Sequence, residues 1–340
     1  MFDESLFHKL LILRTPGIGP VKYAQLIERF GSAAAAAESL RADQTLVDAV
    51  RREMDLADSL NIRYVCDDQP EYPKNLLSVK NRPPVLTVRG NLAALAKPAV
   101  AMVGTRHATG AGMKFMSTLA EAFASRGYAV VSGMAMGTDT AAHNGALVAP
   151  GDENTIAVLA GGVDYIWPLE NERLYHYILE RGAVISELPV GSTPVANNFI
   201  QRNRWVAGIS EKLILGEADL KSGSMATAGF AQDYGRPVFA IPGHPSDARS
   251  FGPNRLIKQG RAVLCEGISD FFAADEKTEL ADSKERAANN DVLDKIGNIP
   301  ISESVLTELV KKDIAKIKRE LVVLELAGRI KKLDAGYVKI

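Results

Sequence analysis

A continuous apolar run that ends in glycine, AVAMVGTR at residues 99–106, is the most informative part of this sequence. Apolar residues without alternating polar ones are typical of a strand buried on both faces of a parallel sheet. Gly104, directly after the run, suits a tight turn into a following helix. The run therefore predicts the first strand of an α/β domain.

The same strand-and-helix unit recurs through the middle of the chain. The expected strands lie at residues 99–103, 128–131, 155–159, 183–185, 212–215 and 237–241. The expected helices between them lie at residues 112–125, 138–148, 172–180, 201–209 and 225–233. Such repeats mean a parallel sheet covered by helices on both faces, so we predict a doubly wound α/β fold.

Two smaller domains are expected beside this core. Residues 1–77 show helical periodicity, and PGIGP at 16–20 resembles the hairpin of helix-hairpin-helix modules, so this part is predicted to be a helical domain. Residues 78–274 form the expected Rossmann-like domain and the acid-rich residues 275–290 a linker. Residues 291–340, with helical stripes and a hairpin pattern, follow the plan of a winged-helix domain.

Composition excludes a disordered protein, a collagen-like fibre and a small disulfide-stabilised domain. The 340 residues are 46% hydrophobic, with 40 Lys and Arg against 41 Asp and Glu, so a DNA-binding role needs local basic patches. Two distant cysteines have no metal-ligand spacing and indicate a reducing compartment. No apolar stretch is long enough to span a membrane, and the first residues lack a basic segment, so we expect no membrane contact and a cytoplasmic location.

Glycines and small polar residues cluster where the predicted strands end. In an open α/β sheet this edge binds ligands, and glycine lets main-chain N–H groups approach an anion. Tight strand-to-helix turns would explain any single cluster, but several along one edge favour a phosphate site. The candidates are Gly104, Thr105, Arg106, Ser132, Gly133, Ser222, Gly223 and Ser224.

A second feature is the segment FIQRNRW at residues 199–205. It places Arg202, Asn203 and Arg204 beside Phe199 and Trp205. Arginine binds phosphates in a bidentate manner, and an aromatic ring stacks on an unpaired base. Alternatively, the two aromatic residues belong to the core and the arginines pair with acidic residues such as Glu187 or Glu217. The segment alone does not decide between these readings.

Catalytic and cofactor motifs are missing. Asp139 and His143 lie four residues apart on one predicted helix, but no G-x-S-x-G elbow, H-E-x-x-H, G-x-G-x-x-G or G-x-x-x-x-G-K-[ST] motif occurs. We therefore expect no catalytic residue, no metal and no cofactor. The lysine-rich helix around Lys311 to Arg319 is either a DNA contact or a solvated face.

Taken together, these segments resemble the bacterial DNA-processing protein A family (DprA, also called Smf). The resemblance covers nearly the whole chain and implies an extended Rossmann-like core flanked by an N-terminal SAM-like helical domain and a C-terminal winged-helix domain. It is carried by VGTR at 103–106, VSGMA at 131–135, NFIQRNR at 198–204, SGS at 222–224 and GRPVFAIPG at 235–243.

The resemblance implies a homodimer that binds and protects single-stranded DNA and loads a RecA-type recombinase onto it during DNA uptake and natural transformation. Single-strand DNA-binding protein is a further candidate partner, and no turnover is implied. By the same resemblance, Arg106 and Arg202 would contact phosphates and Arg204 would join them or hold the loop. The glycine loops would hold anions, and Phe199 would stack on a base.

A nucleotide-processing enzyme of the phosphoribohydrolase type is the alternative on the same fold. That class needs a P-G-G-x-G-T segment, and the nearest stretch here, AGGVD at 160–164, lacks the proline and the threonine.

Overall fold

A nine-stranded sheet forms the centre of the molecule in the computed structural model, which describes residues 3–272, 291–326, 328–333 and 335–340. The strand order is β1-β2-β6-β5-β4-β3-β7-β8-β9, and all neighbours from β6 to β9 are parallel. The strands are β1 (Arg63–Cys66), β2 (Val85–Gly90), β3 (Ala99–Val103), β4 (Ala129–Ser132), β5 (Thr155–Val158), β6 (Gly182–Ser186), β7 (Lys212–Leu215), β8 (Val238–Ala240) and β9 (Val263–Leu264).

The order of the strands reverses between β3 and β7. Strands β3 to β6 follow one another outward on one side, and the chain then returns through one helix to place β7 on the other side of β3. A reversal of this kind leaves a crevice at the carboxyl ends of the two central strands. This position is where the candidate site lies.

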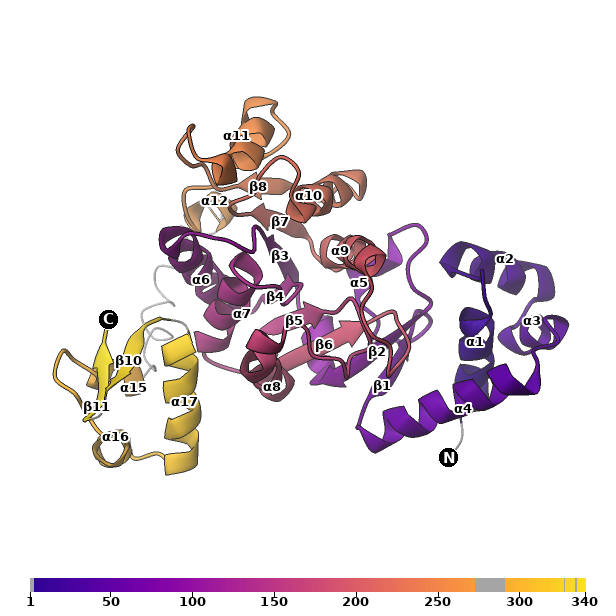
Figure 1. The fold of residues 1–340 in the computed structure, drawn as a ribbon, viewed down its shortest axis with the longest axis horizontal. Helices are drawn as coiled ribbons and strands as arrows, with labels where there is room; N and C mark the ends of the chain where they lie inside the picture. Colours follow the sequence, from indigo (N-terminus) through magenta and orange to yellow (C-terminus); the bar gives the residue numbers. More distant parts are fainter. Residues whose placement is uncertain (1–2, 273–290, 327, 334) are drawn as a thin grey trace.

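Helices cover both faces of the sheet (Figure 1), as the sequence predicts. Alternate side chains of β3 point to opposite faces, so that Val100 and Met102 pack in one hydrophobic cluster and Ala101 and Val103 in another. One face carries α6 (Gly110–Ala124), α7 (Thr138–Val148), α8 (Glu172–Arg181) and α12 (Ser269–Phe272). The other carries α5 (Lys74–Leu77), α9 (Ala196–Ile209), α10 (Gly223–Asp233) and α11 (Phe251–Lys258), and short 3₁₀ turns lie at η1 (Leu92–Ala96), η2 (Leu169–Asn171) and η3 (Ala248–Ser250).

Three strands were missed by the sequence analysis: β1 and β2 at one edge of the sheet and the two-residue β9 at the other. Strands β1 and β2 pair antiparallel with each other, and β2 pairs antiparallel with β6, so the sheet begins at Arg63 and not after the expected boundary at residue 77. Neither strand belongs to a strand-helix-strand repeat, and β1 is only four residues long. Helix α9 likewise begins at Ala196 rather than near residue 201.

An amino-terminal helical unit lies at one end of the sheet (Figure 1), consisting of α1 (Glu4–Arg14), α2 (Pro20–Phe30), α3 (Ala33–Ser39) and α4 (Gln44–Ser59). Ser32 caps α3 by accepting the Ala35 N–H at 3.2 Å. The buried carboxylate of Glu53 accepts two hydrogen bonds from Arg14, at 2.8 and 2.7 Å, and one from the Val190 N–H at 3.4 Å. The Arg14 bonds join α1 to α4, and the Val190 bond joins the helical unit to the loop that follows β6.

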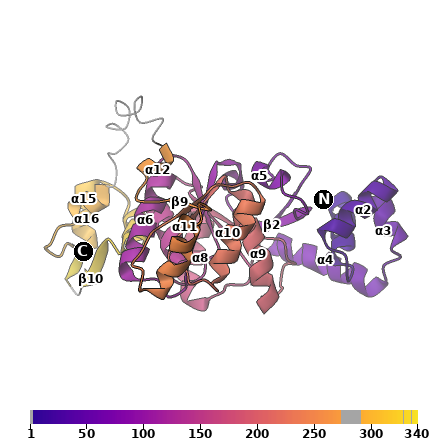
Figure 2. The ribbon, with the colours of Figure 1, turned by 90° about the horizontal axis from the view of Figure 1, so that it is seen from above.

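The carboxyl-terminal unit lies at the opposite end, as both views show (Figures 1 and 2). Its elements are α15 (Asp291–Lys295), α16 (Glu303–Val310), α17 (Ile314–Leu326), β10 (Ile330–Leu333) and β11 (Gly336–Lys339). The unit docks on the core: Asn144 of α7 donates to the Leu326 carbonyl at 3.0 Å, and Arg329 pairs with Glu121 of α6 at 2.7 Å. The elements are those expected, and the assignment as a winged-helix domain stays a prediction.

The predicted linker at residues 275–290 lies outside the described residues. Within the described part of the chain, no helix is both long and apolar enough to cross a bilayer.

Candidate functional site

A groove of about 460 Å³ opens at the carboxyl edge of the sheet, where the strand order reverses. Its walls are the loops after β3, β4 and β7 together with the first half of α9. This confirms that the glycine-rich strand ends predicted from the sequence meet at one edge. The predicted residues that line the groove are Gly104, Thr105, Arg106, Gly133, Phe199, Arg202, Asn203, Ser222, Gly223 and Ser224.

Two predicted residues are not brought to the groove. Ser132 is fully buried at the end of β4, and its hydroxyl donates to the Met102 carbonyl at 2.6 Å. Arg204 lies two positions after Arg202 on α9, which places it on the other side of that helix. Its guanidinium lies over the Trp205 ring at 4.6 Å and donates to the Gln201 carbonyl at 3.3 Å.

The loop after β3 is held in place from both sides. The Thr105 N–H donates to the Glu217 carbonyl at 2.6 Å, and the Thr105 carbonyl accepts the Thr138 N–H at the start of α7 at 3.1 Å. The Glu217 carboxylate accepts from the N–H of Thr109 at 2.8 Å and also from its hydroxyl. Glu217 therefore does not pair with the arginines of α9, one of the readings left open by the sequence, and instead fixes the loop that carries Arg106.

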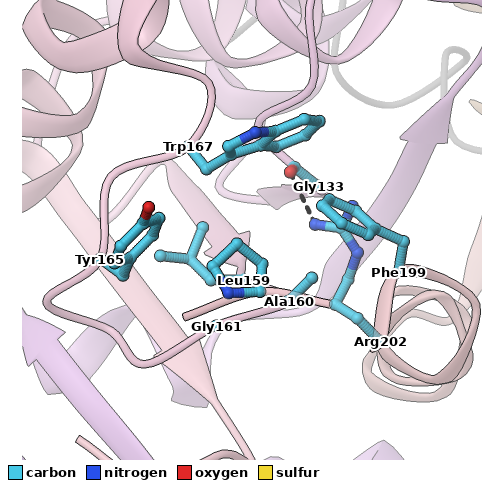
Figure 3. Close-up of a pocket in the computed structure, with 9 residues that line it drawn as sticks. Gly133, Leu159, Ala160, Gly161, Tyr165, Trp167, Phe199 and Arg202 are labelled. Atoms are coloured by element: carbon cyan, nitrogen blue, oxygen red, sulfur yellow. Dashed lines mark hydrogen bonds between the residues drawn. The ribbon is translucent and has the colours of Figure 1, made fainter. Parts of the chain in front are cut away.

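The floor of the groove is built around Arg202, which is only 6% exposed. Its Nη1 donates to the Gly133 carbonyl at 2.6 Å (Figure 3). The same Nη1 also donates to the Val158 carbonyl, and Nε donates to Asn203 at 3.1 Å. One guanidinium thus ties together the ends of β4 and β5. Arg202 lines the groove, but its Nη1 and Nε already have acceptors inside the protein, so the phosphate contact that the resemblance implies for this side chain stays a prediction.

Asp139 provides a negative charge near this buried cation. Its carboxylate accepts the N–H groups of Gly133 at 3.2 Å and Ala135 at 3.4 Å, so it braces the loop after β4. Burial raises the pKa of Asp139, and the Arg202 charge together with these N–H groups counteracts that rise. Burial also lowers the pKa of Arg202 to about 10, an effect that Asp139 opposes and the Arg106 charge reinforces, so Arg202 stays protonated at neutral pH.

His143, the other candidate from the sequence, is buried one turn further along α7. Its Nδ1 lies 2.7 Å from the Thr155 hydroxyl, which itself donates to the Val130 carbonyl at 2.7 Å. The imidazole Nε2 is buried and has no hydrogen-bond partner among the residues that the structure describes. Burial and the charge of Arg202 lower the pKa of His143 to about 3, so the ring is neutral and does not face the groove.

The rim of the groove carries the exposed guanidinium of Arg106. It lies 4.9 Å from the centre of the Trp167 ring and 5.7 Å from that of Phe199. The two rings touch edge to face, with centres 4.6 Å apart. The rings hold the cation by cation–π attraction, while its exposure leaves it able to meet a ligand anion.

Three further residues of this site were missed by the sequence analysis. Lys221 lines the groove, and Tyr165 and Trp167 line a small recess beside it. Tyr165 and Trp167 belong to no motif and lie in the loop after β5, between the glycines at 161–162 and α8. A usable signal was present, since this loop follows one of the glycine-marked strand ends. Lys221 directly precedes the predicted SGS loop.

The start of α10 forms another wall of the groove. Ser222 caps this helix by accepting the Ser224 N–H at 3.2 Å, and Asn203 of α9 donates to the Gly223 carbonyl at 3.3 Å. The first N–H groups of a helix have no acceptor within it and carry partial positive charge. This wall is therefore suited to an anionic group.

Chemically, the groove combines anion-binding groups with flat apolar rings. Arg106, Lys221 and the first turn of α10 suit phosphate, and Phe199 and Trp167 suit a planar heterocycle. No cluster of three or more metal-ligating His, Cys, Asp or Glu side chains is present among the described residues.

Comparison with known proteins agrees with this geometry. The family described as DNA recombination-mediator protein A matches residues 63–275, and the DprA-like N-terminal HHH domain matches residues 3–52. Protein Smf of Escherichia coli is 34% identical over 292 residues, which cover 80% of this chain and 76% of Smf.

Two solved structures are similar as well. DNA processing protein A from Streptococcus pneumoniae superposes with a TM-score of 0.66 at 30% identity, covering 79% of this chain and 97% of that one. DNA processing protein A from Helicobacter pylori, described for its single-stranded DNA binding mode, gives a TM-score of 0.57 at 33% identity, covering 63% and 96%. With the family match spanning the sheet and its groove, this chain belongs to the DNA recombination-mediator protein A family.

Proposed function

We propose that the groove binds single-stranded DNA. The observation that carries this proposal is the rim, where the exposed Arg106 guanidinium lies against the rings of Trp167 and Phe199. In a single strand, an exposed cation can bind a phosphate while an aromatic ring beside it stacks on the neighbouring unpaired base. Lys221 and the start of α10, which also line the groove, extend the same chemistry along a polymer.

The aromatic rim favours an unpaired strand over a duplex. A ring stacks on the flat face of a base, and in a duplex these faces are covered by neighbouring base pairs. The similarity to the Helicobacter pylori protein, described for its single-stranded DNA binding mode, supports the same preference.

The wider role that we propose follows the family. The protein, as a cytoplasmic homodimer, would bind incoming single strands, protect them and load a RecA-type recombinase onto them during DNA uptake and natural transformation, without chemical turnover. A nearly neutral net charge of −1 fits a protein that holds DNA through a local patch and then releases it. The phosphoribohydrolase alternative is not favoured, because the relatives that match most of the chain are DNA-processing proteins.

The test of binding is fluorescence anisotropy with labelled oligo-dT and with a duplex of the same length. We expect the single strand to bind more tightly, with a slope of log affinity against log salt near −0.7 for each neutralised phosphate. Equal affinity for both DNA forms, or affinity that does not change with salt, would contradict the proposal. A parallel nucleotide-hydrolysis assay should show no product.

The loading step has its own readout. A RecA-type recombinase hydrolyses ATP when it assembles on DNA, so the protein should shorten the lag of that hydrolysis on a strand already covered by single-strand DNA-binding protein. Protein that binds the strand but leaves the lag unchanged would retain the binding role and refute the loading role.

A further inference from the structure

A shallow recess adjoins the groove, and no function has been assigned to it above. It is lined by Leu159, Ala160, Gly161, Tyr165, Trp167 and Pro194, and it shares Gly133, Phe199 and Arg202 with the groove (Figure 3). Its enclosed volume is about 10 Å³, room for about one water molecule. A nucleobase therefore does not fit inside it and has only the rings at its mouth as a surface.

The rings at this mouth are available to a ligand. Tyr165 is 39% exposed, and Trp167 and Phe199 are half-buried, so each ring is anchored in the protein yet keeps part of its surface in solvent. Figure 3 shows Tyr165 across the recess from Phe199 and Arg202, whereas the Trp167 ring lies against that of Phe199. The aromatic surface therefore continues from Phe199 through Trp167 toward Tyr165.

Arg106 links the two parts of this surface. Its guanidinium lies over both the Trp167 and the Phe199 rings, at 4.9 and 5.7 Å from their centres. Because the rings meet edge to face, a single base cannot stack flat on both of them at once. A cation between two differently oriented rings suits the phosphate that joins two successive nucleotides.

We infer that Trp167 is a second base-stacking position of this groove, so that successive unpaired bases of one strand stack on Phe199 and on Trp167 while Arg106 binds the phosphate between them. The inference rests on the proposed single-strand binding and adds a residue, a direction and a ligand class to it. The ligand is an unpaired base in a DNA strand that leaves the groove over the loop after β5.

Intrinsic fluorescence tests this position directly. The sequence has two tryptophans, and Trp205 is 1% exposed in the core, so a base can stack only on Trp167. Oligo-dT should quench the emission of the wild-type protein, whereas an abasic oligonucleotide of the same length should bind without quenching. The variant Trp167→Phe should lose the quenching and stay within a few-fold of the wild-type affinity.

Affinity supplies the second measurement. Trp167→Ala should weaken oligo-dT binding by about 5- to 150-fold, the range for loss of one stacked base, and should weaken abasic binding much less. Leu169→Ala is the matched control, because Leu169 lies two residues after Trp167 and is 74% exposed, but it lines neither the groove nor the recess. Its affinity should equal that of the wild type.

The outcomes separate the two proposals. Wild-type protein that binds no single strand would refute the proposed function. Binding without quenching, together with unchanged affinity of Trp167→Ala, would refute the second stacking position alone. Equal loss for oligo-dT and abasic DNA would also refute it, since Trp167 would then only support Arg106. If Trp167→Ala does not fold, the quenching comparison with Trp167→Phe still decides.

Discussion

The floor and the rim of the groove each contain one central arginine, and the two are used in opposite ways. On the floor, Arg202 is 6% exposed and its Nη1 is bound by main-chain carbonyls. On the rim, Arg106 is exposed and lies over two aromatic rings. The first holds the ends of two strands in place, and the second is free to meet a ligand.

The difference shows that an arginine in a binding motif is not automatically a ligand contact. A buried guanidinium that satisfies carbonyl groups contributes to stability and to the shape of the site. An exposed one contributes to affinity and hardly to stability. Substitutions at the two positions should therefore separate folding from DNA binding.

The largest expected effect is at the floor. Arg202→Ala leaves the carbonyls of Gly133 and Val158 without their donor and removes the cation that offsets buried Asp139, so the free energy of unfolding should fall by about 3–5 kcal/mol. Urea denaturation followed by circular dichroism measures this loss. In a double-mutant cycle, Asp139→Asn should partly compensate for Arg202→Ala. Unchanged stability combined with lost DNA binding would show that Arg202 contacts DNA and does not hold the floor of the groove together.

The next effect is at the rim. Arg106→Ala should weaken oligo-dT binding by about 1.5–3 kcal/mol and reduce the salt slope by about 0.7, because one charged phosphate contact is lost. Unfolding should change by no more than about 0.5 kcal/mol, since the side chain is exposed.

The matched control for this rim substitution is Arg126→Ala. Arg126 is also exposed and lies 5.3 Å from the centre of the Phe272 ring, just past the end of α6 and outside the groove lining. Equal losses of oligo-dT affinity for Arg106→Ala and Arg126→Ala would contradict a phosphate contact specific to Arg106.

A third effect is the pH dependence of stability, which comes from the buried His143 near Arg202. His143 has a pKa of about 3 in the folded protein against 6.5 ordinarily. Below pH 6.5 the unfolded chain therefore binds a proton that the folded chain does not, and stability from this group falls by up to about 1.4 kcal/mol per pH unit. Thermal melts from pH 7 to pH 4 should show a shallower decline for His143→Asn. Parallel declines for both proteins would mean that His143 does not titrate in this way.

The smallest expected effect lies outside both regions. Lys318 of α17 is already 3.6 Å from the Glu303 carboxylate, and its unit docks on α6 and α7. Lys318→Ala should therefore change oligo-dT affinity by less than about 0.5 kcal/mol. A loss as large as that of Arg106→Ala would move part of the interface to the carboxyl-terminal unit.

Sequence reasoning recovered the parallel core because its elements carry local signals. Residues 99–106 contain both the apolar run of the buried strand β3 and the glycine of the turn that follows it. Helix α7 was predicted with its observed ends, 138 and 148. Strand β1 was missed because it has four residues and its place in the sheet depends on β2, more than fifteen residues away.

The candidate site was predicted less completely than the fold. Glycine-rich strand ends revealed the right edge of the sheet, since parallel strands must bring their carboxyl ends together. Ser132 and Arg204 were assigned to the groove because a linear motif does not show which side of a strand or helix a residue occupies. Trp167 was overlooked because its partners, Phe199 and Arg106, are distant in sequence.

By itself, the order of apolar runs, glycines and helical periods determined the parallel α/β core and the edge where its loops meet, because each of these signals acts over a few neighbouring residues. Only the tertiary structure decided that Arg202 is buried, that Arg106 is exposed and that Trp167 stands beside Phe199. Burial and side-chain contact depend on segments brought together by folding, so the division between a structural floor and a binding rim cannot be read from any one stretch of the chain.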